Sequence, residues 1–350
     1  MPTIAIITSG GDAPGMNAAI SVIMKTAYSK GWNVLGVEDG YDGLIDGRFI
    51  PLNVHEYDDL IREGGTMLRS ARSDRFRTTE GRKQAARNLS GCDALIVIGG
   101  NGSLMGAKIL SEEHNIRVVG IPASIDNDIA CTSLSIGVDT AVNSIVEACD
   151  KISDTARSHR RAFIVEVMGR ECGYLAMTSA IASGADAVLF REQGKSEEQL
   201  IQELREVIRH SYSAVRNKKR VLIIKAEGVE VSTALLAEHL EQTMQEDTNG
   251  ATLRYTVLGH IVRGGRPSAM DRLIASRLGF TATIAAIEGK TGVMVGWRAD
   301  EQGEACADPR VQLFTLSEVL ETTQKLLDGT HPTAQKRLKM ISKVQDILLL

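Results

Sequence analysis

Short apolar runs alternate along this chain with longer segments in which apolar residues recur at helical spacing. The apolar runs, rich in Ile and Val, predict strands over 3–8, 33–38, 93–98, 117–121, 161–168, 185–190, 220–226 and 291–296. The amphipathic segments predict helices over 16–30, 103–112, 139–157, 174–183, 197–215, 232–245 and 269–288. Strands that are apolar throughout must be buried on both faces, so this alternation predicts an α/β fold with mainly parallel sheets covered by helices.

The chain is longer than one typical domain. Its 350 residues, 43% of them hydrophobic, can bury a large core, so we expect two Rossmann-like domains. No short repeat and no low-complexity linker divides the sequence, and connections such as 128–138 are the candidates for a boundary. We therefore expect the chain to cross between the domains more than once. One helix start is marked directly, because Ser196 and Gln199 have the spacing of a capping box.

Composition excludes several classes of protein. The net charge of −4 comes from 40 basic and 44 acidic residues without a long block of either sign, so bulk attraction to nucleic acid is not expected. No apolar run approaches the roughly 20 residues that a membrane span needs, and the N-terminus has no basic start. An odd number of cysteines without a CxxC pair argues against a disulfide framework: Cys92, Cys131, Cys149, Cys172 and Cys306. We expect a soluble protein of the reducing cytoplasm.

Glycines cluster where predicted strands lead into helices, in "TSGGDAPGMNAA" after the first strand and in "IGGNGSLMGA" after the third. Such turns let backbone N–H groups approach a phosphate, and the following helix N-terminus favours negative charge, although tight turns also use glycine for structural reasons alone. Gly100, Gly102 and Gly106 imitate a dinucleotide fingerprint, but no acidic residue follows about 20 positions later at a strand end. A nicotinamide enzyme is thus the weaker interpretation.

Two carboxylates, Asp126 and Asp128, follow the predicted strand 117–121 in "SIDND". They fall at the carboxyl edge of a sheet, where open α/β folds bind ligands. If residues 124–128 are extended, the two side chains point the same way. One could then accept a hydroxyl proton while the other holds Mg²⁺ on a phosphate. The structural alternative is an Asx-turn or a helix cap.

Basic residues recur near predicted strand ends in the second half of the chain, and several converging guanidinium groups would bind a phosphorylated metabolite. The candidates are Arg161, Arg170, Arg254, Arg263 and His260. Taken singly, each is as readily explained as a solvated surface charge. Glu227 ends a predicted strand where a carboxylate could accept sugar hydroxyls, whereas Met168 on composition alone fits the core.

Several motifs of the chain, taken together, resemble one family, the bacterial 6-phosphofructokinases. They occur in the family's order, between about residue 3 and about residue 300: "TSGGDAPGMNAAI", "DGYDGL", "GGTMLRSAR", "IGGNGS", "SIDNDI", "IVEVMGRECGYLA" and "VLGHIVRGGRPS". The resemblance implies transfer of a phosphoryl group from ATP to the 1-hydroxyl of fructose 6-phosphate, with Mg²⁺. It also implies a nucleotide-binding domain over 1–137 and 262–310, and a sugar-phosphate-binding domain over 138–261 and 311–350.

The resemblance also assigns roles to residues. Asp126 matches the catalytic base, Arg170 the arginine that stabilises the moving phosphoryl group, and Ser124 a threonine that donates to it. Asn101 and Asp128 match the metal positions. The nucleotide-binding stretch is matched by Gly11, Tyr41, Arg72, Gly102, Ser103, Met105 and Gly106, and the sugar-phosphate pocket by Met168, Glu227, His260 and Arg263 together with Ser124, Asp126 and Arg170. Arg161 and Arg254 match two arginines that the family's site receives from a neighbouring subunit, which implies a homo-oligomer, usually a tetramer.

Some positions depart from the family pattern. Asn101 stands where the family has a magnesium-binding aspartate. The asparagine side chain keeps an oxygen that can bind the metal but lacks the negative charge of the aspartate. Pyrophosphate-using relatives have an aspartate at the position of Gly102 and a lysine at that of Ala123, and neither is present; Ala123 replaces the glycine of ATP users. At the family's effector pocket, Ser21, Val54 and Ser153 replace arginines, while Lys25, Arg216 and Lys218 stay basic, so allosteric regulation is an open question.

The resemblance therefore favours an ATP-dependent 6-phosphofructokinase. The alternatives are the same fold using pyrophosphate or another sugar phosphate such as sedoheptulose 7-phosphate, and a non-catalytic sensor of sugar phosphates or nucleotides. Only Asn101 motivates the sensor, and retention of Asp126, Asp128 and Arg170 argues against it.

Overall fold

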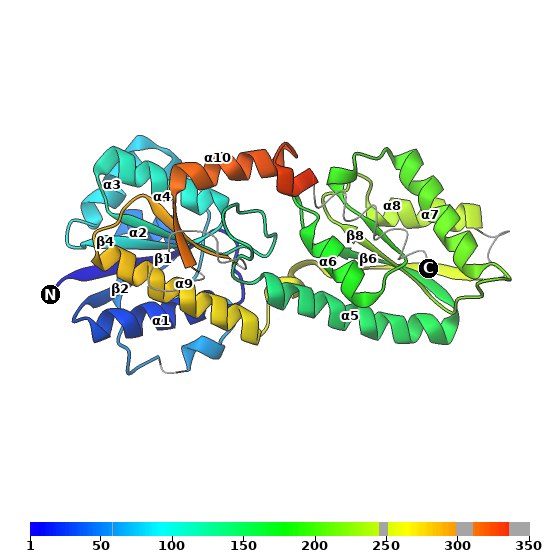
Figure 1. The fold of residues 1–350 in the computed structure, drawn as a ribbon, viewed down its shortest axis with the longest axis horizontal. Coiled ribbons are helices and arrows are strands. Elements are labelled where there is room, and N and C mark those ends of the chain that lie inside the picture. Colours follow the sequence, from blue (N-terminus) through cyan, green and yellow to red (C-terminus); the bar gives the residue numbers. More distant parts are fainter. Residues whose placement is uncertain (58, 245–250, 299–310, 336–350) are drawn as a thin grey trace. The chain divides into compact units, whose positions relative to one another are not determined.

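The computed structural model describes residues 1–57, 59–244, 251–298 and 311–335. Contacts within the chain divide it into two compact units (Figure 1). Unit 1 comprises Met1–Thr140 and Arg263–Lys325, and unit 2 comprises Ala141–Val262 and the segment that begins at Leu326. The chain therefore crosses between the units more than once, as the sequence predicted.

Unit 1 is built on a seven-stranded sheet in the order β11-β10-β5-β4-β1-β2-β3. The strands are β1 (Thr3–Ser9), β2 (Asn33–Val37), β3 (Phe49–Pro51), β4 (Ala94–Gly99), β5 (Val118–Pro122), β10 (Val293–Trp297) and β11 (Val311–Thr315). The five inner strands are parallel, whereas β3 and β11 pair antiparallel at the two edges. The carboxyl ends of β1, β4 and β5 consequently meet at one edge of the sheet.

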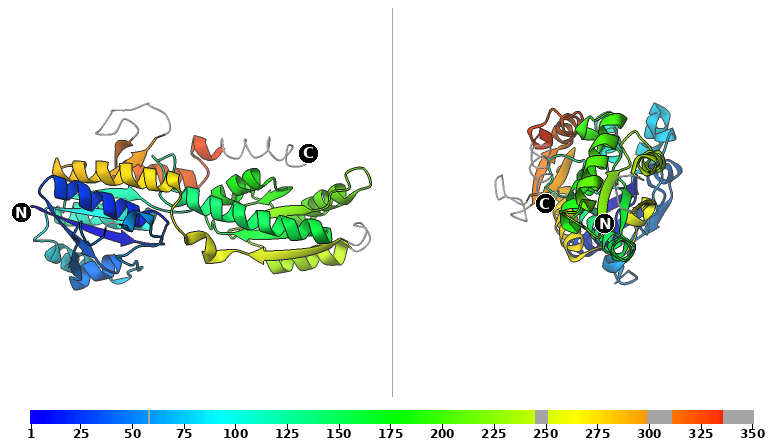
Figure 2. Two further views of the ribbon diagram at one scale, coloured as in Figure 1. Left: turned by 90° about the horizontal axis from the view of Figure 1, so that it is seen from below. Right: turned by 90° about the vertical axis from the view of Figure 1, so that its right-hand side faces the viewer.

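Helices cover both faces of this sheet (Figures 1 and 2). Helices α1 (Met16–Ser29) and α9 (Ala269–Ile287) lie side by side on one face. The other face carries α2 (Gly40–Asp46), α3 (Thr79–Asn88), α4 (Asn101–His114) and α10 (Leu316–Leu327). Short 3-10 turns lie at η1 (Leu60–Arg62) and η2 (Arg75–Arg77). Buried side chains such as Ile7, Val97 and Leu104 fill the layer beneath α4, which fixes the start of that helix at the sheet edge.

Unit 2 contains a smaller, wholly parallel sheet in the order β7-β8-β6-β9. Its strands are β6 (Arg161–Val167), β7 (Ala187–Leu189), β8 (Val221–Ala226) and β9 (Thr252–Val257). Its helices are α5 (Val138–His159), α6 (Tyr174–Ser183), α7 (Glu197–Tyr212) and α8 (Thr233–Met244), with 3-10 turns η3 (Arg191–Gln193) and η4 (Gly259–Arg263). Residues of α7 and α8 pack on one sheet face in a single buried cluster. The predicted capping box is present: Ser196 Oγ accepts from the Gln199 N–H at 3.4 Å, and Gln199 Oε1 accepts from the Ser196 N–H at 2.9 Å.

The predicted strands and helices are all found within a few residues of their expected bounds, which confirms the α/β class. The sequence pattern did not predict α2, β3, α3, β9, β11 or α10. Strand β9 lies at a sheet edge and is largely exposed, and α3 is rich in charged residues, so neither gives an apolar signal. Residues 311–325, which the sequence analysis grouped with the second domain, lie in unit 1, because β11 pairs with β10.

Two further expectations concern the whole chain. Among the described residues, Cys92, Cys131, Cys149 and Cys172 form no disulfide, and Cys306 lies outside them. The helices of the described part of the chain include none that is both long and apolar enough to cross a membrane.

Candidate functional site

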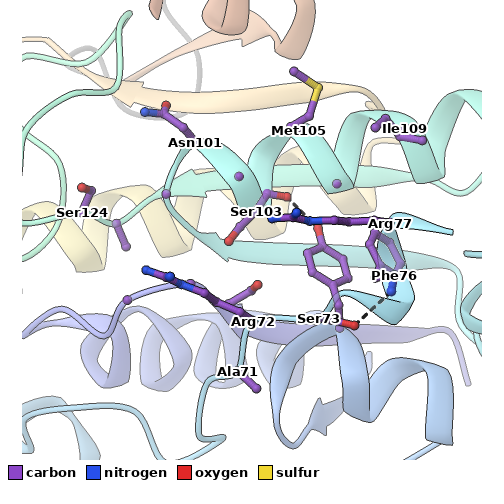
Figure 3. A pocket seen from close by; sticks show the side chains of 18 of the residues that line it. Ala71, Arg72, Ser73, Phe76, Arg77, Asn101, Ser103, Met105, Ile109 and Ser124 are labelled. Carbon is purple, nitrogen blue, oxygen red and sulfur yellow. Dashed lines mark hydrogen bonds between the residues drawn. The ribbon is translucent and has the colours of Figure 1, made fainter. Parts of the chain in front are cut away.

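The carboxyl ends of β1, β4 and β5 enclose a cavity of about 640 Å³ in unit 1. Register brings these ends together, because Ser9 pairs with Gly99 and Gly99 with Pro122. The cavity is therefore lined by the segments that the sequence predicted to carry chemistry: Ser9, Gly10 and Gly11 after β1, residues 100–106 at the start of α4, and Ala123, Ser124, Asp126 and Asp128 after β5. Figure 3 shows part of this lining.

Glycines are required where the backbone segments approach one another. A Cβ at Gly99 would lie 2.4 Å from the Ser9 carbonyl oxygen, and a Cβ at Gly11 would lie 2.6 Å from an Arg263 guanidinium nitrogen. Arg263 in turn donates to the Asp12 carbonyl oxygen at 3.1 Å. The small residues thus bring a guanidinium group and the N-terminus of α4 to the same cavity, an arrangement that suits phosphate.

The opposite part of the cavity is apolar and aromatic. The rings of Tyr41 and Phe76 stack with centroids 3.9 Å apart, and the Tyr41 hydroxyl donates to the Ser103 carbonyl oxygen at 2.6 Å. Burial raises the pKa of Tyr41, which keeps this donor protonated. A Cβ at Gly106 would lie 3.1 Å from both rings, so glycine leaves their edges accessible beside Met105. This region suits a flat apolar group such as a nucleobase.

The polar end of the cavity contains a hydrogen-bonded group. Asn101 Nδ2 donates to Asp128 Oδ2 at 2.7 Å, and Ser124 Oγ donates to Asp128 Oδ1 at 3.0 Å. Ser124 Oγ also accepts from the Asp126 N–H at 3.3 Å. Asn101 Oδ1 is buried and accepts no hydrogen bond from the described residues. The cavity therefore gathers carboxylate and amide oxygens, the donors that a hard cation prefers. This group has only two carboxylates, and the described residues contain no cluster of three or more His, Cys, Asp or Glu able to hold a metal.

The segment 124–128 is not extended, the condition under which the two carboxylates would point the same way. Ile125 and Asp126 form a turn, and Asn127 has a left-handed backbone with φ of 51°. The Asn127 side chain fixes this turn, since it donates to the Ser133 carbonyl oxygen and accepts from the Ser135 N–H. Asp126 and Asp128 nevertheless both line the cavity, so it is the turn that brings the two carboxylates to the same cavity.

Other basic residues line the cavity from the segment that follows residue 70. Arg72 and Arg77 both lie there, and Arg77 is largely exposed. Arg82 is committed elsewhere, because its guanidinium group donates to both carboxylate oxygens of Glu113 at 2.6 and 2.8 Å. Arg77 pairs only loosely with the exposed Asp74, with its Nε 3.7 Å from Asp74 Oδ1, so Arg72, Arg77 and Arg263 are the basic groups of the lining able to meet an anion.

Unit 2 holds the remaining candidates in two separate parts of its sheet. Met168 and Arg170 follow β6 and Glu227 follows β8, where the Glu227 N–H donates to the Val167 carbonyl oxygen at 2.9 Å. His260 follows β9 at the same carboxyl edge. Two other arginines stand apart from these residues within the unit: Arg161 begins β6, and Arg254, on β9, donates to Glu241 Oε1 at 2.9 Å.

Comparison with known proteins decides what kind of molecule this is. The family model for phosphofructokinase matches residues 3–286. The ATP-dependent 6-phosphofructokinase of Thermotoga neapolitana is 45% identical over 86% of this chain and 91% of its own length. That of Clostridium botulinum strain Alaska E43 is 47% identical over the same shares. This chain belongs to the phosphofructokinase family.

The phosphofructokinase fold extends to solved structures. The phosphofructokinase of Saccharomyces cerevisiae superposes with a TM-score of 0.84 at 33% identity, over 96% of this chain and 47% of the yeast chain, so this chain spans about half of the yeast one. A pyrophosphate-dependent phosphofructokinase of Marinobacter aquaeolei superposes with a TM-score of 0.77 at 22% identity, over 91% of this chain and 84% of that one. The family, enzyme class and two-domain α/β fold predicted from the sequence are confirmed.

The phosphofructokinase cavity of unit 1 contains every residue that the sequence analysis assigned to nucleotide, metal and base: Gly11, Tyr41, Arg72, Asn101, Gly102, Ser103, Met105, Gly106, Ser124, Asp126 and Asp128. It also contains Arg263, assigned to the sugar phosphate. Several other residues line the cavity and were not predicted as site residues from the sequence: Ala71, Ser73, Phe76, Arg77, Arg82 and Ile109. Most of these follow no strand, so the pattern of strand ends could not indicate them; the spacing of Ile109 four residues after Met105 on α4 was the one usable signal.

Proposed function

We propose that this chain catalyses the ATP-dependent phosphorylation of fructose 6-phosphate at its 1-hydroxyl, the reaction of ATP-dependent 6-phosphofructokinases in glycolysis, giving fructose 1,6-bisphosphate. The observation that carries the proposal is one cavity with an aromatic end, at Tyr41 and Phe76, and a carboxylate end, at Asp126 and Asp128. Such a cavity can hold a base and a polyphosphate chain with the terminal phosphate next to a proton acceptor.

ATP binds along this cavity. Its adenine lies against the edges of the aromatic pair beside Gly106 and Met105, where apolar contact supplies affinity. Its phosphates lie along Gly11, Arg72, Gly102 and Ser103, where the α4 N-terminus and Arg72 offset their charge. A side chain at Gly102 would project into open space, so glycine here keeps room for the donor. This favours ATP over pyrophosphate, since a smaller donor would need that space filled.

Mg²⁺ fits the oxygen donors at the carboxylate end. Asn101 Oδ1 and the Asp128 carboxylate would hold it together with water and the phosphates of ATP, since Mg²⁺ typically takes few protein ligands. When bound, the ion neutralises charge on the transferring phosphoryl group. Asp128 is kept in place by Ser124 and Asn101.

Asp126 acts as the general base on the 1-hydroxyl. Its backbone N–H donates to Ser124 Oγ, and Ser124 Oγ in turn donates to Asp128. The hydroxyl of Ser124 therefore links the base to the proposed metal ligand. The base takes the hydroxyl proton as the oxygen attacks the terminal phosphorus of ATP, and the bond from phosphorus to the bridging oxygen of ADP breaks. Ser124 and Arg170 stabilise the negative charge on the phosphoryl group in the transition state of the transfer.

The sugar phosphate binds through the remaining candidates, with Glu227 accepting sugar hydroxyls and Met168, His260 and Arg263 completing its site. Arg161 and Arg254 serve the 6-phosphate of a neighbouring subunit, which makes the active molecule a homo-oligomer, in the form of a tetramer. Residues 1–140 with 263–325 constitute the nucleotide-binding domain in this proposal, and unit 2 the sugar-phosphate-binding domain. A cytoplasmic location and allosteric control stay predictions.

The proposal is tested with purified protein, fructose 6-phosphate, Mg²⁺ and either ATP or pyrophosphate, with sedoheptulose 7-phosphate as a second acceptor. Formation of ADP and fructose 1,6-bisphosphate with ATP as the better donor supports it. Faster turnover with pyrophosphate would overturn the donor, and binding of both substrates without turnover would indicate a sensor.

A further inference from the structure

Two residues beside the cavity combine a strained backbone with a mutual ion pair. Asp39 and Arg69 both have φ of 58°, a left-handed conformation that is unfavourable for an arginine. Their side chains meet in a two-point contact, with Arg69 Nε 2.7 Å from Asp39 Oδ1 and an Arg69 terminal nitrogen 2.9 Å from Asp39 Oδ2. This hydrogen-bonded pairing holds the pKa of Asp39 below its ordinary range. Strained backbone conformations of this kind persist only where surrounding contacts hold them, and they are often found at functional sites.

The strained residues fasten the segment that leads to the cavity. The Arg69 carbonyl oxygen accepts from Thr8 Oγ1 at 2.7 Å, and Ser70 Oγ donates to the Gly10 carbonyl oxygen at 2.5 Å. The Asp39 N–H donates to the Leu68 carbonyl oxygen at 2.8 Å. The segment is thereby tied to the end of β1 and to the start of α2 on either side of Arg69. It belongs to no helix or strand, so these contacts, and not a regular element, set its course.

The course of this segment decides where Arg72 lies. Ala71, Arg72 and Ser73 lie two to four residues after Arg69 and line the cavity. A change of backbone direction at Arg69 would displace all three, because Arg69 ends the turn in which its N–H donates to the Thr66 carbonyl oxygen at 3.1 Å. The two-point geometry of a guanidinium and a carboxylate fixes direction as well as distance.

We propose that Asp39 and Arg69 are positioning residues for the nucleotide: their ion pair holds Arg69 in its left-handed conformation, and this sets the course of residues 69–73 that presents Arg72 to the ATP phosphates. This rests on the proposed function in one respect, that ATP occupies the unit 1 cavity. Neither residue lines the cavity, so the pair acts through Arg72 and does not touch substrate.

The test uses Asp39→Asn in the full-length protein. Asparagine tolerates the left-handed backbone and keeps the shape of the side chain, so the variant removes chiefly the charge. We expect KM for ATP to rise about 5- to 30-fold, the effect of losing one good polar contact, with kcat within about twofold and KM for fructose 6-phosphate unchanged. Arg48→Ala is the matched control, because Arg48 also pairs with Asp39 but lies outside the segment; its KM for ATP should change less than twofold.

A second pair of variants separates positioning from general stability. In the Arg72→Ala background, Asp39→Asn should raise KM for ATP no further, since the residue it positions is gone. Multiplying effects of the two substitutions would overturn the proposal, as would an equal rise of both KM values or a lowered melting temperature with unchanged KM. Wild-type protein that binds ATP in calorimetry but does not phosphorylate fructose 6-phosphate would contradict the proposed function only, and the same comparisons would then be made on the Kd for ATP.

Discussion

The sheets of the two units hold the polar side chains near the carboxyl ends of their parallel strands in different ways. In unit 1, Asn101, Ser124 and Asp128 lie on loops and at a helix start, and they hydrogen-bond chiefly among themselves. In unit 2, Lys225 on β8 lies opposite Glu166 on β6, with Lys225 Nζ 3.1 Å from Glu166 Oε2 and only 1% of the lysine side chain exposed. Loop groups can change with little effect on the core, whereas a buried pair between strands is part of it. Substitutions in the first region should change turnover and ligand affinity, and those in the second should change stability.

The largest effect should follow from Asp126→Asn. It should lower turnover about 10²- to 10⁴-fold, because an amide cannot take the hydroxyl proton, while folding and sugar-phosphate binding stay intact. Steady-state kinetics with circular dichroism and a binding titration check this. Turnover above about a tenth of wild type would remove the base role.

The counterpart in unit 2 is Lys225→Ala. It leaves the partly buried Glu166 carboxylate without its lysine; breaking a fully buried pair typically costs about 3–5 kcal/mol, and the loss here should be smaller because 19% of the Glu166 side chain is exposed. Denaturant unfolding followed by circular dichroism should show the loss. Lys225→Met combined with Glu166→Gln is the matched control and should recover most of it, because Thr233 Oγ1 can still bond the amide. Equal destabilisation by both variants would mean that packing, and not charge, is what Lys225 supplies.

A mixing experiment connects the two regions. Arg254→Ala protein and Asp126→Asn protein, each inactive at moderate substrate, should regain part of the activity when they form hybrid oligomers. Some sites would then join an intact Asp126 to an intact Arg254 of the neighbouring subunit. Native mass spectrometry establishes that hybrids form; hybrids without regained activity would refute the shared site.

The smallest effect is expected at Asn101. Asn101→Asp restores a carboxylate next to Asp128 and should lower the Mg²⁺ concentration for half-maximal activity by a few fold, because two close carboxylates attract a cation that offsets their repulsion. A magnesium titration at saturating ATP and fructose 6-phosphate measures it, with the preference for ATP over pyrophosphate unchanged. Superimposable curves for the two proteins would show that Asn101 does not control the metal requirement.

The sequence by itself determined the elements that are buried on both faces and the turns that end them. Apolar strands such as 93–98 and the glycines that follow them are local signals, since burial and tight turns restrict which residues can occupy each position. The motif order then identified the family and about half of the residues that line the unit 1 cavity. Exposed or charged elements such as β9 and α3 gave no such signal and were missed.

Only the tertiary structure decided how distant side chains combine. The bonds from Asn101 to Asp128 and from Arg69 to Asp39 join residues far apart in the chain, and no local pattern encodes them. The left-handed turn at Asn127 and the stacking of Phe76 on Tyr41 likewise depend on neighbours that folding supplies. Local periodicity reports burial, whereas the direction of a loop depends on the contacts that outweigh its own conformational preference.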